Sequence, residues 1–200
     1  FLPVLNLSQK LNILYLYRVL SAALDSVGVK HFLMDGSLLG LHRHGGIIPW
    51  DDDLDVSVSL DAWELVQQSL ACVEGFTLNK RREGHWKFHY NTGYYPFVDI
   101  FFYRMDETYV WAALESARKT FIYPTKLVFP LGESIFEGMK VPVPNDSLRI
   151  TRRIYEYHVC DAYSLHMERN VSFSDADSKG YSITSLPCHN ISYMYTFYNI

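Results

Sequence analysis

Apolar residues recur at the spacing of an α-helix in the first part of the chain, between residues 11 and 23. Ser8 can cap such a helix, and Gly28 suits the left-handed conformation that often ends one. An apolar run at residues 30–34 then predicts a short buried strand, and a short helix is expected over residues 37–41. The chain therefore opens as helix, strand and helix.

The centre of the chain changes to the alternation that is typical of strands. Residues 54–59 alternate with period two, which indicates a strand with one buried face. Asp61 and Glu64 have the spacing of a capping box at the start of a helix. The remaining elements are expected as strands at residues 76–79, 86–90 and 96–103 and helices at residues 61–72 and 145–158.

This order of elements predicts an α/β (α+β) domain over residues 1–160, with a mixed sheet flanked by helices. Residues 161–200 are rich in Ser and Tyr and keep no sustained period. We expect them to form a poorly defined C-terminal tail.

Composition narrows the class of protein. Lys and Arg number 18 against 22 Asp and Glu, so the net charge is −4 and generic binding to nucleic acid is disfavoured. With 48% hydrophobic and 20% charged residues, the chain can bury a core. The three cysteines show no C-x-x-C spacing, which indicates neither a zinc knuckle nor a disulfide scaffold. No run is apolar enough to span a membrane, so any anchor is expected outside this sequence.

An acidic run stands directly before the strand at residues 54–59. In an extended chain Asp51, Asp53 and Asp55 share one face, whereas Asp52 points away. Three neighbouring carboxylates repel one another unless a cation lies between them, and oxygen ligands suit Mg²⁺ or Mn²⁺. The alternative is a solvated acidic turn, but the apolar residues on both sides place the run at the mouth of a buried strand.

Two further features fit a metal-dependent reaction on phosphate. Gly36 and Ser37 follow a strand and open a helix, where free backbone N–H groups can bind a phosphate. Asp99 is the only charge in an apolar strand, and it is either a third metal ligand or a general base, or a carboxylate held by protein donors. Arg43 can bind phosphate or be an exposed helix charge, and Lys87 can meet a phosphate or be solvated.

These motifs resemble the LicD family, which has the nucleotidyltransferase fold. The resemblance rests on four stretches: Gly36-Ser37-Leu38-Leu39-Gly40 with Arg43; Ile48-Pro49-Trp50-Asp51-Asp52-Asp53-Leu54-Asp55; Phe97-Val98-Asp99-Ile100-Phe101-Phe102-Tyr103; and Phe136-Glu137-Gly138 with the helix after Asn145. It implies that Asp53, Asp55 and Asp99 are catalytic and bind the metal. It also implies that Gly36, Ser37, Arg43 and Asp51 bind the substrate, and the position of Lys87 near the acidic strand adds it as a further candidate for binding the substrate.

The resemblance implies a phosphotransferase that moves an alditol-phosphate, sugar-phosphate or phosphocholine group from a CDP-activated donor to a hydroxyl of a glycan or glycoprotein, releasing CMP. A non-catalytic glycan-binding or complex-forming member is the alternative, and nucleotidyl transfer proper is a third hypothesis. A secretory-pathway location, in the Golgi lumen, is expected. N-glycosylation triplets at Asn6, Asn145, Asn170 and Asn190 permit that location.

Overall fold

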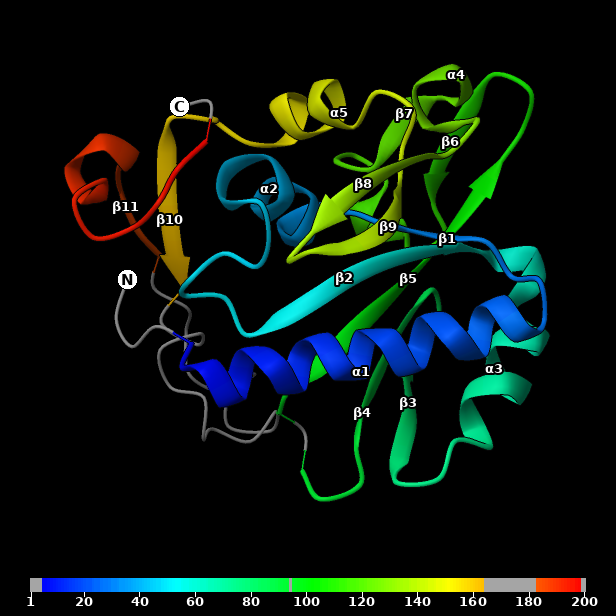
Figure 1. Ribbon diagram of the computed structural model, residues 1–200. Coiled ribbons are helices and arrows are strands. Elements are labelled where there is room, and N and C mark those ends of the chain that lie inside the picture. The colour runs from blue at the N-terminus through cyan, green and yellow to red at the C-terminus, as the bar shows by residue number, and fades with distance from the viewer. Residues whose placement is uncertain (1–4, 94, 164–182, 199–200) are drawn as a thin grey trace.

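A mixed sheet with helices on both faces forms the centre of the computed structural model, which describes residues 5–93, 95–163 and 183–198 (Figure 1). Within these residues the spatial order of the main strands is β1 (His31–Leu33), β2 (Asp53–Ser59), β5 (Phe97–Met105), β4 (His85–Tyr90) and β3 (Phe76–Arg82). The strands β6 (Tyr109–Ala112) and β7 (Ile122–Pro124) continue from the second half of β5. The predicted fold class is confirmed.

The pairing of β2 with β5 decides where the acidic residues lie. These two strands are parallel, and their register sets Asp53 opposite Phe97 and Asp55 opposite Asp99. The other neighbours in the sheet pair antiparallel, and Lys87 of β4 lies opposite Asp99. Because side chains on neighbouring strands at the same register point to the same face, Asp55, Asp99 and Lys87 share one side of the sheet.

The two faces of the sheet differ in chemistry. Leu54, Val56 and Val58 of β2 are fully buried on the face that packs against α1 (Leu7–Ser26), with α3 (Trp63–Ala71) beside α1. On the opposite side of β2 in Figure 1 lie α2 (Asp35–His44) and α5 (Ser147–Ile154), which contact each other. The apolar face supplies the core, so the acidic residues of β2 face α2.

Local chemistry explains where several helices begin and end. Asn6 caps α1 with a capping box that includes Gln9, and Gly28 with a φ of 70° follows the helix. Asp146 caps α5, as expected. The capping box expected at Asp61 is wrong, because the Ser59 hydroxyl accepts from the Asp61 amide and a 3-10 turn (η1, Leu60–Ala62) precedes α3.

The region between β7 and α5 was not assigned from the sequence. It contains a short helix α4 (Thr125–Val128) and a hairpin of β8 (Gly132–Phe136) and β9 (Met139–Val143). Pro142 lies in this two-stranded hairpin and not in the central sheet, in agreement with the loss of its backbone donor.

The described residues 183–198 of the segment expected as a tail form regular structure. Residues 183–198 contain β11 (Ile183–Pro187), which pairs with β10 (Val159–Tyr163), and a 3-10 turn η3 (Cys188–Ile191). A disulfide joins Cys160 to Cys188, which corrects the expectation of no disulfide. Cys188 and Ile191 pack in a second hydrophobic cluster with Trp50. A domain boundary at residue 160 stays a prediction.

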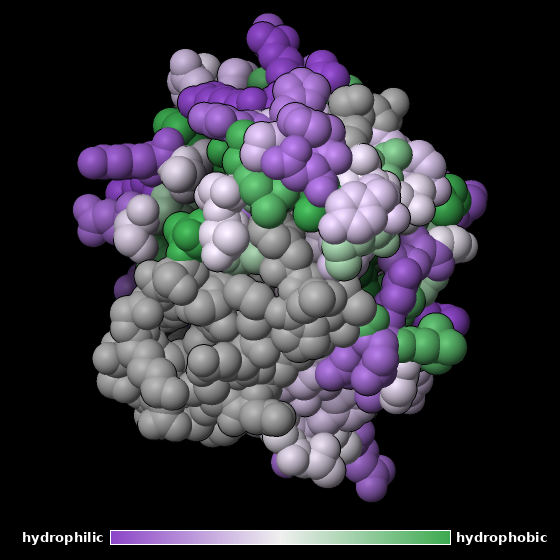
Figure 2. Space-filling view, turned by 90° about the vertical axis from the view of Figure 1, so that its left-hand side faces the viewer, coloured by the Kyte–Doolittle hydropathy of each residue, from purple (hydrophilic) through white to green (hydrophobic). Residues whose placement is uncertain are grey.

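The surface on the left-hand side of the view in Figure 1 carries both hydrophilic and hydrophobic side chains. Figure 2 shows hydrophilic side chains along its upper edge, with smaller hydrophobic areas between them. Among the helices that the structure describes, none has the length and hydrophobicity required to cross a membrane. Asn170, one of the four glycosylation triplets, lies outside the described residues.

Candidate metal centre and active-site pocket

Three carboxylates from two strands converge at the beginning of β2. One oxygen each from Asp53, Asp55 and Asp99 lies within 4.8 Å of the other two. The parallel register of β2 and β5 produces this arrangement, because it sets Asp55 level with Asp99. The sequence-predicted metal residues are therefore brought together in space.

A second set of carboxylates shares Asp53. Oxygens of Asp51, Asp52 and Asp53 also lie within 4.8 Å of one another. The expectation that Asp52 points away applied only if Asp52 lies in the strand, and it does not. The strand begins only at Asp53, while the Asp51 amide donates to Ile48 O in the preceding turn, so the strand alternation does not apply.

The electrostatics of this cluster are unfavourable for full ionisation. Burial, followed by repulsion from Asp55, raises the pKa of Asp53 well above its usual range. Burial and repulsion from Asp35 raise the pKa of Asp55 in the same direction. Such a set of converging carboxylate oxygens fits a hard divalent cation such as Mg²⁺ or Mn²⁺, which would remove the repulsion.

The start of α2 lies against this cluster. The Ser37 amide donates to Asp55 Oδ2 at 3.2 Å, and the Asp55 amide donates to the Ser37 hydroxyl at 2.7 Å. A Cβ at Gly36 would lie 3.1 Å from Asp51 Oδ2 and 3.2 Å from Asp55 Oδ2, so a larger residue fits only if these carboxylates move slightly. The Ser37 amide, expected to face a phosphate, thus holds a carboxylate.

Asp35 is a site residue that the sequence analysis missed. It precedes Gly36 and has a φ of 42°, an unusual conformation for a residue with a side chain. Burial, with repulsion from Asp99 as the next cause, raises the pKa of Asp35 to about 6. Its position in the Asp-Gly-Ser turn was the only available signal.

Asp99 has two cationic or titratable partners on β4. Lys87 Nζ lies 2.6 Å from Asp99 Oδ1, and His85 Nε2 lies 3.0 Å from the same oxygen. Lys87 Nζ also lies 3.5 Å from the centre of the Phe97 ring. Lys87, expected at a donor phosphate or in solvent, is buried against Asp99. His85 is not among the candidate site residues of the sequence analysis, although the strand alternation places it on the same face as Lys87.

Arg43 is buried and is not an exposed helix charge. Its Nη2 donates to Tyr157 O and Val159 O, each at 3.0 Å, and its Nη1 lies 3.7 Å from Cys160 Sγ. Burial lowers the pKa of this guanidinium. Arg43 therefore joins α2 to the segment that leads into β10.

A cavity of about 260 Å³ opens beside the acidic cluster. Its acidic side consists of Asp35, Asp51, Asp53 and Asp55, with Gly36 between them. The remaining wall is formed by Leu39, Arg43, Ile48, Trp50, Tyr155, Glu156, Val159 and Asp161. Trp50 Nε1 donates to Asp161 O at 2.9 Å, which ties the loop before β2 to β10 within this wall. Neither Lys87 nor Asp99 is among the described residues that line this cavity.

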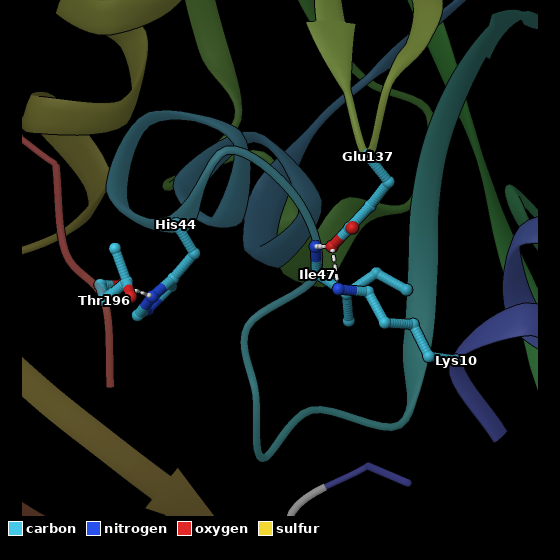
Figure 3. Close-up of polar contacts among 5 residues, drawn as sticks. All are labelled: Lys10, His44, Ile47, Glu137 and Thr196. Carbon is cyan, nitrogen blue, oxygen red and sulfur yellow. Dashed lines mark hydrogen bonds and ion pairs between the residues drawn. The ribbon is translucent and has the colours of Figure 1, made fainter. Parts of the chain in front are cut away.

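The loop between α2 and β2 is held from outside the cavity (Figure 3). Glu137, in the turn between β8 and β9, accepts from the Ile47 amide at 3.1 Å and pairs with Lys10 Nζ at 2.7 Å. At the other end of the loop, His44 Nδ1 lies 2.8 Å from Thr196 O. These contacts position the segment that delivers Asp51 to the cluster.

A family model described as "LicD/FKTN/FKRP, nucleotidyltransferase domain" matches residues 28–146, which include the acidic cluster. The chain is 30% identical over 141 residues to ribitol 5-phosphate transferase FKRP of Mus musculus and to that of Homo sapiens. Each alignment covers 66% of this chain and 28% of the relative. The chain therefore spans just over a quarter of the length of either relative.

Two other proteins are similar. "Uncharacterized protein RP689" of Rickettsia prowazekii is 29% identical over 143 residues, which cover 68% of this chain and 50% of the relative. Among solved structures, the lincomycin-bound lincosamide antibiotic adenylyltransferase LnuA aligns with a TM-score of 0.46 and 14% identity, over 71% of this chain and 82% of that chain. That alignment is too distant to bear on function.

Proposed function

The chain belongs to the LicD/FKTN/FKRP nucleotidyltransferase-domain family, and on this basis we propose that it is a metal-dependent phosphotransferase. It moves an alditol-phosphate, sugar-phosphate or phosphocholine group from a CDP-activated donor to a glycan hydroxyl, and CMP leaves. The observation that supports this most is the convergence of Asp53, Asp55 and Asp99 within 4.8 Å beside a cavity. A protein that only binds glycan has no need of this arrangement.

Asp53, Asp55 and Asp99 are the proposed ligands of Mg²⁺ or Mn²⁺. The bound ion would neutralise charge on the donor pyrophosphate as CMP leaves. Ser37 orients Asp55 through the two hydrogen bonds described above, and Gly36 leaves room between α2 and the carboxylates. Asp51 is the proposed outer ligand or orienting residue on the cavity side.

The two basic residues have other proposed roles than direct capture of phosphate. Arg43 keeps the segment before β10 in place as a cavity wall, because its Nη2 is committed to two carbonyls. Lys87 pairs with the carboxylate of Asp99. Asp99 keeps Oδ2 for the metal, or for the proton of the acceptor hydroxyl, while Oδ1 contacts Lys87.

We also propose a location in the secretory pathway, in the Golgi lumen, with a glycan or glycoprotein as acceptor. The Cys160–Cys188 disulfide supports this, because disulfides form and persist in oxidising compartments. Asn145 is a poor glycosylation site, since its side-chain amide donates to Lys126 O.

The test is CMP release from a panel of CDP-activated donors, with and without Mg²⁺. We expect release with at least one donor and glycan acceptor, and none in EDTA. Asp55→Ala should reduce the rate on the order of a thousandfold, since several kcal/mol of barrier depend on the metal. Asp61→Ala, which removes an exposed carboxylate on η1, is the matched control and should keep the wild-type rate.

Three outcomes would contradict the proposal. Release of pyrophosphate from CTP identifies nucleotidyl transfer in place of phosphotransfer. Near-normal CMP release by a folded Asp55→Ala variant excludes a metal-centred mechanism. Glycan binding without turnover of any donor supports the non-catalytic alternative.

A further inference from the structure

A lysine ammonium occupies one side of the carboxylate cluster. Lys87 Nζ is 2.6 Å from Asp99 Oδ1, which is within ion-pair distance, and both residues are only 7% exposed. His85 Nε2 approaches the same oxygen at 3.0 Å. Oδ1 of Asp99 therefore already lies at ion-pair distance from two side chains of the protein itself.

The surroundings hold this ammonium in place. Lys87 lies in β4, which is hydrogen-bonded on both sides to β5 and β3, so its backbone cannot shift independently. Its Nζ lies 3.5 Å from the centre of the Phe97 ring, an arrangement that favours a desolvated cation. Moving the ammonium away would leave both a buried charge and Asp99 without this pairing, which is strongly unfavourable.

The position of Lys87 restricts what else can bind Asp99. Many phosphoryl-transfer sites hold two metal ions roughly 3.5–4 Å apart, bridged by shared carboxylates. The shared residue Asp53 belongs to both ligand sets in this cluster, so two ions are conceivable from the carboxylates alone. A second divalent ion on Asp99 would lie close to a fixed positive charge, and their repulsion is large where water is excluded.

We infer that Lys87 is a built-in cation that takes the place of a second divalent metal ion at Oδ1 of Asp99, so that the centre binds one ion, through Asp53, Asp55 and the other carboxylate oxygen of Asp99. This inference rests on the metal centre of the proposed function. Lys87 is thus a positioning residue for Asp99 and does not bind the donor, in agreement with its absence from the described lining of the cavity.

The experiment is a titration of the full chain with Mn²⁺ alone, in which electron paramagnetic resonance measures the free ion. We expect wild type to bind one Mn²⁺ per chain, and Lys87→Met either to bind a second or to bind the first on the order of tenfold or more tightly, because a nearby positive charge is removed. Lys87→Arg should keep one ion. Lys80→Met, on an exposed lysine of β3, is the matched control and should behave as wild type.

The direction of the change separates this role from others. A lysine that only supports the fold, or that binds substrate, leaves Mn²⁺ affinity unchanged or lower when it is replaced. Two ions bound by wild type, or unchanged stoichiometry and affinity in folded Lys87→Met, overturn the inference and leave the metal centre intact. Lys87→Gln serves if Lys87→Met does not fold. No Mn²⁺ binding by wild type refutes the metal centre itself, and the inference with it.

Discussion

Removal of the Cys160–Cys188 disulfide tests how the wall of the cavity is held. The two cysteines are 0% and 1% exposed and lie 28 residues apart in sequence. For a closed loop of that length, the loss of chain entropy in the unfolded state corresponds to about 3.6 kcal/mol at 25 °C. We therefore expect the variant Cys160→Ala/Cys188→Ala to lose about that much free energy of unfolding.

The same change should reach the active site. Cys160 follows Val159, which lines the cavity, and Arg43 Nη1 lies 3.7 Å from Cys160 Sγ. Loosening this segment displaces the wall opposite the carboxylates but not the carboxylates themselves. We expect the KM for the donor to rise while kcat falls less, because the lost contacts bind the donor about equally in the ground state and in the transition state.

Urea unfolding followed by far-UV circular dichroism measures the free energy, and thermal unfolding should show a Tm lower by roughly 7–14 °C. Cys72→Ala, at the exposed free cysteine, is the matched control and should change neither. The reasoning is refuted if the double variant unfolds within about 1 kcal/mol of wild type. In that case hydrogen bonds and packing alone keep residues 183–198 in place.

Three further results are expected. Asp53→Asn should raise the Tm of the metal-free protein at pH 7, because the raised pKa of Asp53 makes its ionised form unfavourable. The same variant should abolish the Tm increase caused by Mg²⁺, and an undiminished response to Mg²⁺ places the ion elsewhere. Burial lowers the pKa of His44 to about 4, so the stability that His44 contributes is complete above pH 6.5 and is lost as the pH falls from 6.5 towards 4. His44→Gln should therefore make the free energy of unfolding less dependent on pH over this range, and a pH profile parallel to that of wild type contradicts the reasoning. Glu137→Ala should lower the free energy of unfolding by about 1–3 kcal/mol, because it leaves the Ile47 amide without its acceptor, and it should weaken Mg²⁺ binding. Glu137→Gln keeps an acceptor but loses the Lys10 ion pair, so it should lower the free energy of unfolding by only about 0–1 kcal/mol; equal losses contradict the assigned hydrogen bond.

Much of the acidic site could be predicted because its signals are local in sequence. The alternation of β2 sets the spacing of Asp53 and Asp55, and Asp99 stands out as a lone charge in an apolar strand. Both patterns depend only on the two-residue period of a strand. The parallel pairing of β2 with β5, which brings the three residues together, was not predicted from the sequence.

The partners of the basic residues could not be predicted, because they are distant in sequence or depend on cross-strand register. The carbonyls that Arg43 binds are 114 and 116 residues away. Lys87 meets Asp99 only because β4 and β5 pair in one register, and a shift by one residue would turn it to the other face. Likewise, nothing in the spacing of Cys160 and Cys188 distinguishes a disulfide from two free thiols.

Arg43, Ser37 and Lys87 already contact other groups of the protein, and this determines how the site can bind a negatively charged donor. Arg43 is the only cationic side chain among the described residues that line the cavity, and its Nη2 already donates to two carbonyls. The Ser37 amide bonds to Asp55, and Lys87 to Asp99. A pyrophosphate entering this cavity therefore meets carboxylates on both walls, since Glu156 and Asp161 line the cavity on the side of the Arg43 guanidinium. Without a divalent ion the repulsion between donor and carboxylates would oppose binding, and with the ion the same carboxylates become the reason that the donor binds there. Under the proposed function, the metal would therefore be required for donor binding as well as for the transfer itself.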